Sequence, residues 1–133
     1  MGVDMLSPTR KRVRLIDKWG SGKFGARRGD KEHDGTDFEC SPNQPVLAPI
    51  TGTIEREAPP YATGPYSGLV IKNNHVEIKL FYVDLNKDLI GKCVEKGKTI
   101  GIAQDISKKY PGMIPHVHLR IVKIDPELLL DMP

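Results

Sequence analysis

Glycine and proline interrupt this chain too often for long helices to form. Thirteen Gly and eleven Pro are scattered over its 133 residues. Proline removes a backbone hydrogen-bond donor, and both residues favour turns. A chain of this length has room for one hydrophobic core, and 28% charged residues with a mean hydropathy of -0.37 are typical of a folded soluble domain. The pattern predicts a mainly β domain of short strands joined by defined turns.

The clearest local signal is a β-hairpin between residues 69 and 83. Apolar residues alternate with charged ones from residue 76 to Tyr82, which predicts a strand with one buried face. Asn73 and Asn74 precede this strand, and asparagine tolerates the positive φ of a tight hairpin turn. Further short strands are expected at residues 36–39, 45–49, 52–55 and 116–122, and residues 94–102 are expected to form a turn that leads into another strand.

The two cysteines, Cys40 and Cys93, permit one disulfide or two reduced thiols, and their spacing does not decide between them. They are too few to form a zinc finger. No apolar run is long enough to span a bilayer, and the first residues lack the cationic start and apolar stretch of a signal peptide. The chain as given is therefore expected to be soluble.

Three of the four histidines and one carboxylate fall into two short clusters. His33 and Asp37 are four residues apart, and His116 and His118 are two residues apart. In an extended chain the members of each pair point to the same side. Two imidazoles and a carboxylate suit zinc (Zn2+) in tetrahedral geometry, with the fourth position left to water. The clusters therefore predict a zinc site with an open position, the arrangement that catalysis needs.

Four segments, taken in order, resemble the lysostaphin-type zinc endopeptidases. They are residues 33–37 (HDGTD), 46–54, 94–101 and 116–119 (HVHL). The resemblance spans roughly residues 31–123 and implies an antiparallel β domain with a metal-binding groove. It implies that His33, Asp37 and His118 bind zinc. It also implies that His116 activates water or stabilises the transition state when such enzymes cleave peptide cross-bridges of bacterial peptidoglycan.

One position departs from that family's pattern. The family's tyrosine-x-histidine-leucine segment corresponds here to residues 82–85, so Asp84 stands where a catalytic histidine is expected. An ionised carboxylate accepts a proton but cannot donate a hydrogen bond to a developing oxyanion. Loss of one such donor costs about 2.7–4 kcal/mol, or about a hundredfold to a thousandfold in rate. We therefore expect weak or absent hydrolysis, with an active peptidase as the alternative.

Within the family, residues 81–82 and 110–112 resemble the chemotaxin-2-like branch, whose members lack the same histidine. This resemblance implies an extracellular, zinc-binding module that recognises a cell-surface receptor or an acidic polysaccharide. The branch is held by several disulfides, whereas only Cys40 has a counterpart here. The loop over residues 58–68, which contains Tyr61 and Tyr66, is expected to line the groove beside the metal.

The basic residues gather at the N-terminus. Residues 1–31 carry nine Lys/Arg against three Asp, a net charge of +6, and the remainder carries -3. Such a segment is either a solvated terminus or a salt-sensitive contact for an acidic polymer. With 6% aromatic residues, the chain has too few for a nucleic-acid stacking platform. We therefore divide the chain into a basic Gly-rich arm (1–30), a peptidase-like β domain (31–125) and a tail (126–133).

A different class of protein is a minor alternative. Residues 46–54 and 94–101 also resemble the half-motifs of biotinyl and lipoyl carrier domains, which present a modified lysine on a tight turn. Lys72, beside two asparagines, is the nearest candidate but lacks the usual flanking methionines. This interpretation leaves both histidine clusters without a role.

Overall fold

Short strands make up nearly all the regular structure in the part of the chain that the computed structural model describes, which is residues 5–11, 27–28, 31–32 and 35–124. The strands are β1 (Arg27–Arg28), β2 (Lys31–Glu32), β3 (Thr36–Glu39), β4 (Pro45–Leu47), β5 (Gly52–Glu57), β6 (Gly68–Lys72), β7 (Val76–Phe81), β8 (Val83–Leu85), β9 (Cys93–Val94), β10 (Thr99–Ala103) and β11 (His116–Ile124). Two 3₁₀ turns, Lys87–Leu89 and Ile106–Lys108, complete the regular structure of these residues. No helix within them is long and apolar enough to cross a membrane.

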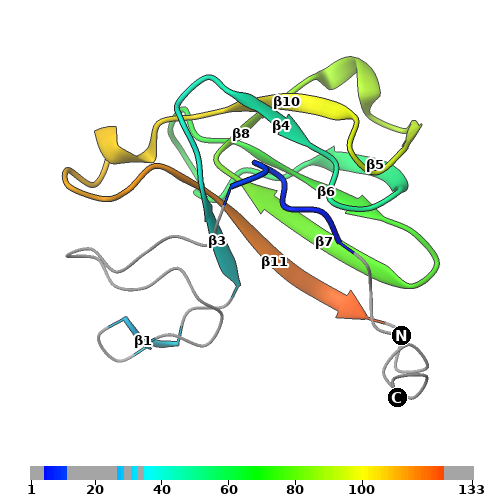
Figure 1. Ribbon diagram of the computed structural model, residues 1–133, viewed down its shortest axis with the longest axis horizontal. Coiled ribbons are helices and arrows are strands. Elements are labelled where there is room, and N and C mark those ends of the chain that lie inside the picture. Colours follow the sequence, from blue (N-terminus) through cyan, green and yellow to red (C-terminus); the bar gives the residue numbers. More distant parts are fainter. Residues whose placement is uncertain (1–4, 12–26, 29–30, 33–34, 125–133) are drawn as a thin grey trace.

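The strands form two main antiparallel sheets, which confirms the predicted fold class. Six strands pair in the order β3-β11-β7-β6-β5-β9, and three pair in the order β4-β10-β8. Among the described residues, strands β1 and β2 form a separate two-stranded pair. In Figure 1 the three-stranded sheet lies above the six-stranded sheet.

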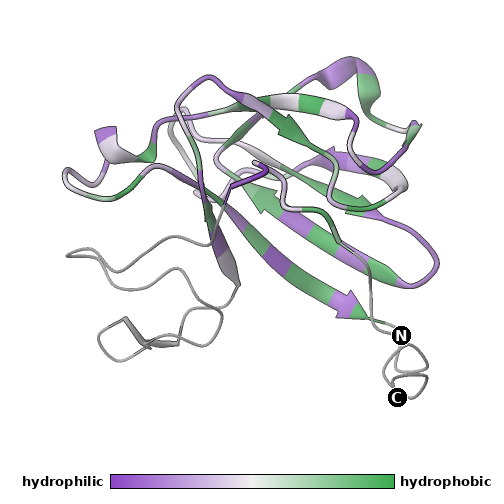
Figure 2. Ribbon diagram, in the orientation of Figure 1, coloured by the Kyte–Doolittle hydropathy of each residue, from purple (hydrophilic) through white to green (hydrophobic). Residues whose placement is uncertain are grey.

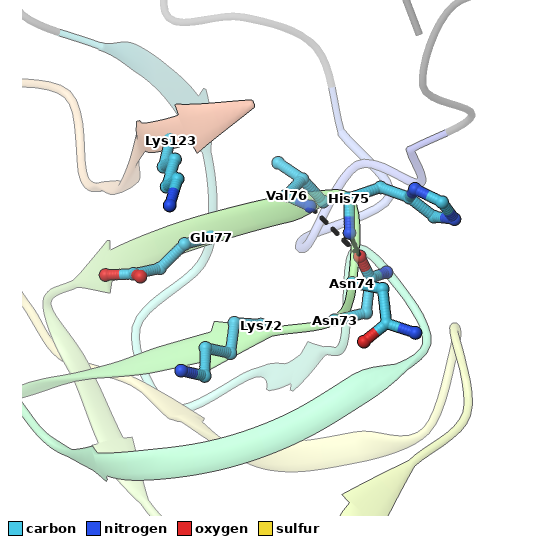
Figure 3. A pocket seen from close by; sticks show the side chains of 7 residues that line it. All are labelled: Lys72, Asn73, Asn74, His75, Val76, Glu77 and Lys123. Atoms are coloured by element: carbon cyan, nitrogen blue, oxygen red, sulfur yellow. Dashed lines mark hydrogen bonds between the residues drawn. The ribbon is translucent and has the colours of Figure 1, made fainter. Parts of the chain in front are cut away.

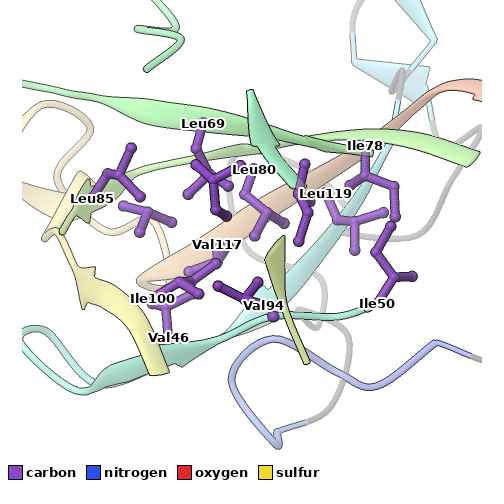
Figure 4. Packing of buried hydrophobic residues seen from close by; sticks show 14 of the residues in the cluster. Val46, Ile50, Leu69, Ile78, Leu80, Leu85, Val94, Ile100, Val117 and Leu119 are labelled. Carbon is purple, nitrogen blue, oxygen red and sulfur yellow. The ribbon is translucent and has the colours of Figure 1, made fainter. Parts of the chain in front are cut away.

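Aliphatic side chains from both sheets meet in one core (Figure 4). Apolar and polar residues alternate along β7 and β11, as the bands in Figure 2 show, so each strand turns one face inward. The inward face of β7 carries Val76, Ile78 and Leu80, each at most 3% exposed. Full burial of one such side chain contributes about 1.5–3 kcal/mol. The core therefore covers one face of the six-stranded sheet and leaves the opposite face available for a site.

The β6–β7 turn forms by a different route from the one predicted. Asn73 and Asn74 are absent from the residues with positive φ. Instead, the Asn73 side-chain oxygen accepts hydrogen bonds from the backbone N–H groups of His75 (2.8 Å) and Val76 (3.0 Å). The asparagine therefore holds the turn through its side chain, and the expected left-handed backbone at these positions is wrong.

The strand predicted to run through residue 83 breaks at Tyr82. Tyr82 has φ 68°, a left-handed conformation that costs a non-glycine residue on the order of 1–3 kcal/mol. The backbone N–H groups of Tyr82 and Val83 both donate to the Ser67 carbonyl, at 2.8 and 3.2 Å, and the Tyr82 carbonyl accepts from Gln104 at 2.9 Å. These contacts hold the kink, and the chain passes there from the six-stranded to the three-stranded sheet.

The described part of the basic arm is anchored to the domain. The Leu6 N–H donates to the Pro49 carbonyl (2.9 Å), and the Leu47 N–H donates to the Pro8 carbonyl (2.8 Å). Met5 packs against the core. Most of the arm, and the tail from residue 126, lie outside the described residues.

The cysteines are both free, Cys40 buried and Cys93 exposed. Cys40 directly follows β3 and Cys93 begins β9, and these are the two outer strands of the six-stranded sheet. The open question of their pairing is thereby answered, because the fold separates the two thiols.

We expect one thiol of the native chain to react with a chromogenic disulfide reagent at mildly alkaline pH, and two after unfolding. Burial raises the pKa of Cys40 to about 12, an effect that nearby Asp105 adds to and Lys11 opposes. Because the raised pKa favours the neutral thiol, Cys40 stays unreactive until pH rises far above its ordinary value of 9.0. Cys93→Ser should abolish the native signal, and a rapid reaction of two thiols in the folded protein would contradict this placement.

Candidate metal centre

The two predicted clusters meet through the register of three neighbouring strands. His118 of β11 lies opposite Asp37 of β3 on one side and opposite Phe81 of β7 on the other. Val117 and Leu119 face the core, so His116 and His118 point to the other face of the sheet. The Phe81 ring stacks on the His118 ring at 5.7 Å with an interplanar angle of 8°. This stacking restricts how the imidazole can turn.

Asp37 is the centre of the site. Its side chain is 0% exposed, and a buried carboxylate requires charged or hydrogen-bonding partners. Its Oδ1 lies 2.6 Å from His118 Nδ1, and its Oδ2 lies 3.4 Å from His116 Nε2. One carboxylate therefore faces both histidines of the H-x-H motif, as the alternation of a strand predicts.

The backbone of the preceding loop orients His116. The His116 Nδ1–H donates to the Ile114 carbonyl at 2.8 Å, which leaves Nε2 as the ring atom that faces Asp37. His116 is 2% exposed. Its Nε2 can therefore accept a proton from a group bound at the site, the role expected of His116 in an active peptidase.

The donor chemistry of this centre fits a divalent metal, and the structure describes two of the three expected ligands. Asp37 and His118 offer a carboxylate oxygen and an imidazole nitrogen that face each other, the combination typical of zinc ligands. Within residues 5–11, 27–28, 31–32 and 35–124, no group of three or more His, Cys, Asp or Glu side chains is placed to hold a metal. His33, the third expected ligand, lies outside the described residues.

All four tyrosines of the chain gather beside His116. The Tyr82 ring meets the His116 ring edge-on at 5.4 Å, and it meets the rings of Tyr61 and Tyr66 at 6.4 and 5.9 Å. The Tyr61 hydroxyl lies 3.1 Å from that of Tyr82 and 3.4 Å from that of Tyr110. The sequence predicts Tyr61 and Tyr66 beside the site. It gives no such prediction for Tyr110, although this residue stands in the loop just before the H-x-H motif.

Two of these tyrosines should ionise only at high pH. Burial raises the pKa of Tyr61, and its hydrogen bonds to Tyr110 and Tyr82 raise it further. Burial also raises the pKa of Tyr66, with a contribution from Asp105. A raised pKa means that the neutral form stabilises the fold. This contribution is complete below the ordinary tyrosine pKa of about 10 and is lost as pH rises through the higher folded value.

Alkaline titration followed at 295 nm should therefore be incomplete in the folded protein, with a late phase that coincides with unfolding. Tyr61→Phe should remove part of the late phase, and it should cost about 1 kcal/mol because the central hydroxyl of the cluster is lost. Simultaneous ionisation of all four tyrosines near pH 10 in the folded chain would contradict the cluster.

Asp84 lies apart from the buried centre. The kink at Tyr82 shifts the alternation by one residue, so Val83 and Leu85 face the core and Asp84 is exposed. Its backbone pairs with Ile102 of β10. The structure therefore places His116, His118 and Asp37 together, and it places the Asp84 carboxylate on the solvent side of β8.

An antiparallel β domain with a buried aspartate facing both histidines of an H-x-H strand defines a class, the metallopeptidase-type β domains. The sequence model of peptidase family M23 matches residues 31–128, and the chain belongs to this family. The match includes residues 46–54 and 94–101, on which the alternative of a biotinyl or lipoyl carrier domain depends. We therefore set that alternative aside.

Three known proteins illustrate the relationship. Leukocyte cell-derived chemotaxin-2 of Mus musculus is 30% identical over 115 residues, covering 85% of this chain and 75% of the relative. The protein of the same name from Bos taurus is 33% identical over 109 residues, covering 80% and 71%. Lysostaphin from Staphylococcus simulans has a TM-score of 0.60 at 21% identity, over 98% of this chain and 55% of that chain. The likeness to lysostaphin bears on the fold alone.

Proposed function

We propose that this chain is a zinc-binding M23 module that recognises a cell-surface receptor or an acidic polysaccharide, and that it hydrolyses peptides weakly or not at all. The observation that carries the proposal is Asp84, a carboxylate where the family pattern has a catalytic imidazole, exposed on β8. An extracellular location belongs to the proposal, because such partners are met outside the cell.

The zinc ligands in this proposal are His33, Asp37 and His118. Asp37 supports the assignment because it is fully buried and lies 2.6 Å from the His118 ring nitrogen. Phe81 holds the His118 ring in place by stacking, and ordered ligands lose less entropy on binding. When bound, zinc would act as a Lewis acid toward a ligand oxygen.

The residues around His116 explain why turnover should be poor. His116 can take a proton through Nε2, since its Nδ1 is held by the Ile114 carbonyl. Hydrolysis also needs a donor for the oxyanion, and Asp84, an exposed carboxylate where the family pattern has an imidazole, supplies none. Binding without an efficient chemical step is the function that these groups support best.

The direct test is incubation of the zinc-loaded chain with peptidoglycan and with glycine-rich peptides, using an active lysostaphin domain as the positive control. We expect no release of peptide fragments above the rate of the His116→Ala variant. Cleavage by the wild type that His116→Ala abolishes would contradict the proposal.

A slow peptidase is the second candidate, and the tyrosine cluster is the observation that favours it. Tyr82 contacts His116, and its hydroxyl lies 3.1 Å from that of Tyr61. Phenol O–H groups can donate to an oxyanion. If cleavage occurs, Tyr82→Phe should reduce it strongly. The same substitution should leave zinc content unchanged, because Tyr82 is not among the expected ligands.

A further inference from the structure

The outer face of the six-stranded sheet continues from the metal centre into two rows of mostly basic side chains. The row of Asp37, His118 and Phe81 comes first. The next row places Arg120 of β11 opposite Lys79 of β7. The third row is Lys123, Glu77 and Lys72, on β11, β7 and β6. We call the second and third rows the basic face.

The basic face holds cations at the close spacing of a sheet. Neighbouring strands lie roughly 5 Å apart and successive rows roughly 7 Å apart. Arg120 and Lys79 are direct cross-strand neighbours, so two positively charged side chains lie side by side in this row. Lys72 has a partner in Glu55 at 3.1 Å, and Glu77 is the acid within the third row. The face therefore favours an anionic partner, with Glu77 opposing it.

A pocket lies at the end of this face, at the β6–β7 turn. It has a volume of about 420 Å³ and is lined by Lys72, Asn73, Asn74, His75, Val76, Glu77 and Lys123. Figure 3 shows the side chains of Lys72, Glu77 and Lys123 on one side and those of the turn on the other. Apart from Val76, every lining side chain is polar or charged. The pocket suits a hydroxylated, charged ligand better than an apolar peptide side chain.

We propose that the basic face and the turn pocket form the binding surface for a linear sulfated polysaccharide. Sulfate groups along the chain would contact Lys79, Arg120 and Lys123, and a sugar unit would enter the pocket. Charge complementarity carries the choice of partner, and the polar pocket favours a glycan over an acidic polypeptide. This inference rests on the recognition part of the proposed function and deepens it, since it names the partner class and a surface outside the zinc centre.

The test measures binding of a heparin octasaccharide to the full chain by calorimetry at low and moderate salt. We expect salt-sensitive binding that a fully desulfated octasaccharide of equal length does not reproduce. Lys79→Ser with Lys123→Ser should weaken binding by about tenfold. Lys92→Ser with Lys98→Ser removes the same charge from exposed positions outside the basic face and should leave affinity within about twofold.

Weaker heparin binding could also result from misfolding of a variant, so a variant that should bind more tightly is tested as well. Glu77→Gln should tighten heparin binding, whereas Glu95→Gln, an exposed acid outside the face, should not. Wild-type affinity in the Lys79/Lys123 variant would overturn the basic face and place the glycan elsewhere, for example on the arm. Equal affinity for polyglutamate would overturn the choice of partner. If heparin does not bind at all, both the inference and the polysaccharide part of the proposed function fail, while the zinc centre is judged by its own metal analysis.

Discussion

Replacing Asp37 by Asn should abolish zinc binding and destabilise the fold by on the order of 3 kcal/mol. The substitution keeps the shape of the side chain but removes the charge that faces His118 at 2.6 Å and His116 at 3.4 Å. Because Asp37 is 0% exposed, water cannot replace the lost interactions. Zinc content by elemental analysis and chemical unfolding of the same samples measure the two effects together.

Glu95→Gln is the control for Asp37→Asn. Glu95 is exposed and lies outside the metal centre, so loss of its charge should change stability by less than about 1 kcal/mol and leave zinc content intact. An Asp37→Asn variant with wild-type zinc content and stability would contradict the role assigned to this carboxylate.

Replacing Gly35 by Ala should destabilise the fold by about 1–3 kcal/mol and also weaken metal binding. An added Cβ would overlap the Leu119 carbonyl oxygen and would lie 2.8 Å from His118 Nε2. The carbonyl belongs to the backbone of β11, so β3 and β11 must move apart. This movement would displace His118 relative to Asp37.

Gly52→Ala separates a general packing effect from an effect on the site. An added Cβ there would lie 2.6 Å from the Lys72 carbonyl oxygen, between β5 and β6. We expect a similar loss of stability with an unchanged zinc affinity of the folded chain. Equal zinc affinities in the two variants would show that Gly35 matters only for packing.

The fold was predictable where apolar and polar residues alternate or where turn-forming residues stand. It was not predictable where contacts between distant residues determine the backbone conformation. Alternation along Val76, Ile78 and Leu80 marked the buried face of β7 correctly. The left-handed backbone of Tyr82 was not visible in the sequence, because the Ser67 and Gln104 backbone groups that hold it are distant in the chain. For this reason the sequence predicts one strand through residue 83, whereas β7 ends at Phe81 and β8 begins at Val83.

The spacing of polar residues in the sequence was enough to predict that His116, His118 and Asp37 belong to one site. The H-x-H spacing placed His116 and His118 on one face, and the pairing of β11 with β3 brought Asp37 to them. Spacing carries no information on which distant rings will pack there. Stacking of Phe81 on His118, and the arrival of Tyr110 in the tyrosine cluster, depend on the sheet order and on the loop before β11.

Anomalous diffraction at the zinc absorption edge, from crystals of chelator-free protein, tests the central claim most directly. We expect one strong peak per chain, bounded by Asp37, His118 and His33. No peak at that position in a crystal grown with zinc present, or His33 directed away from Asp37 and His118, would contradict it.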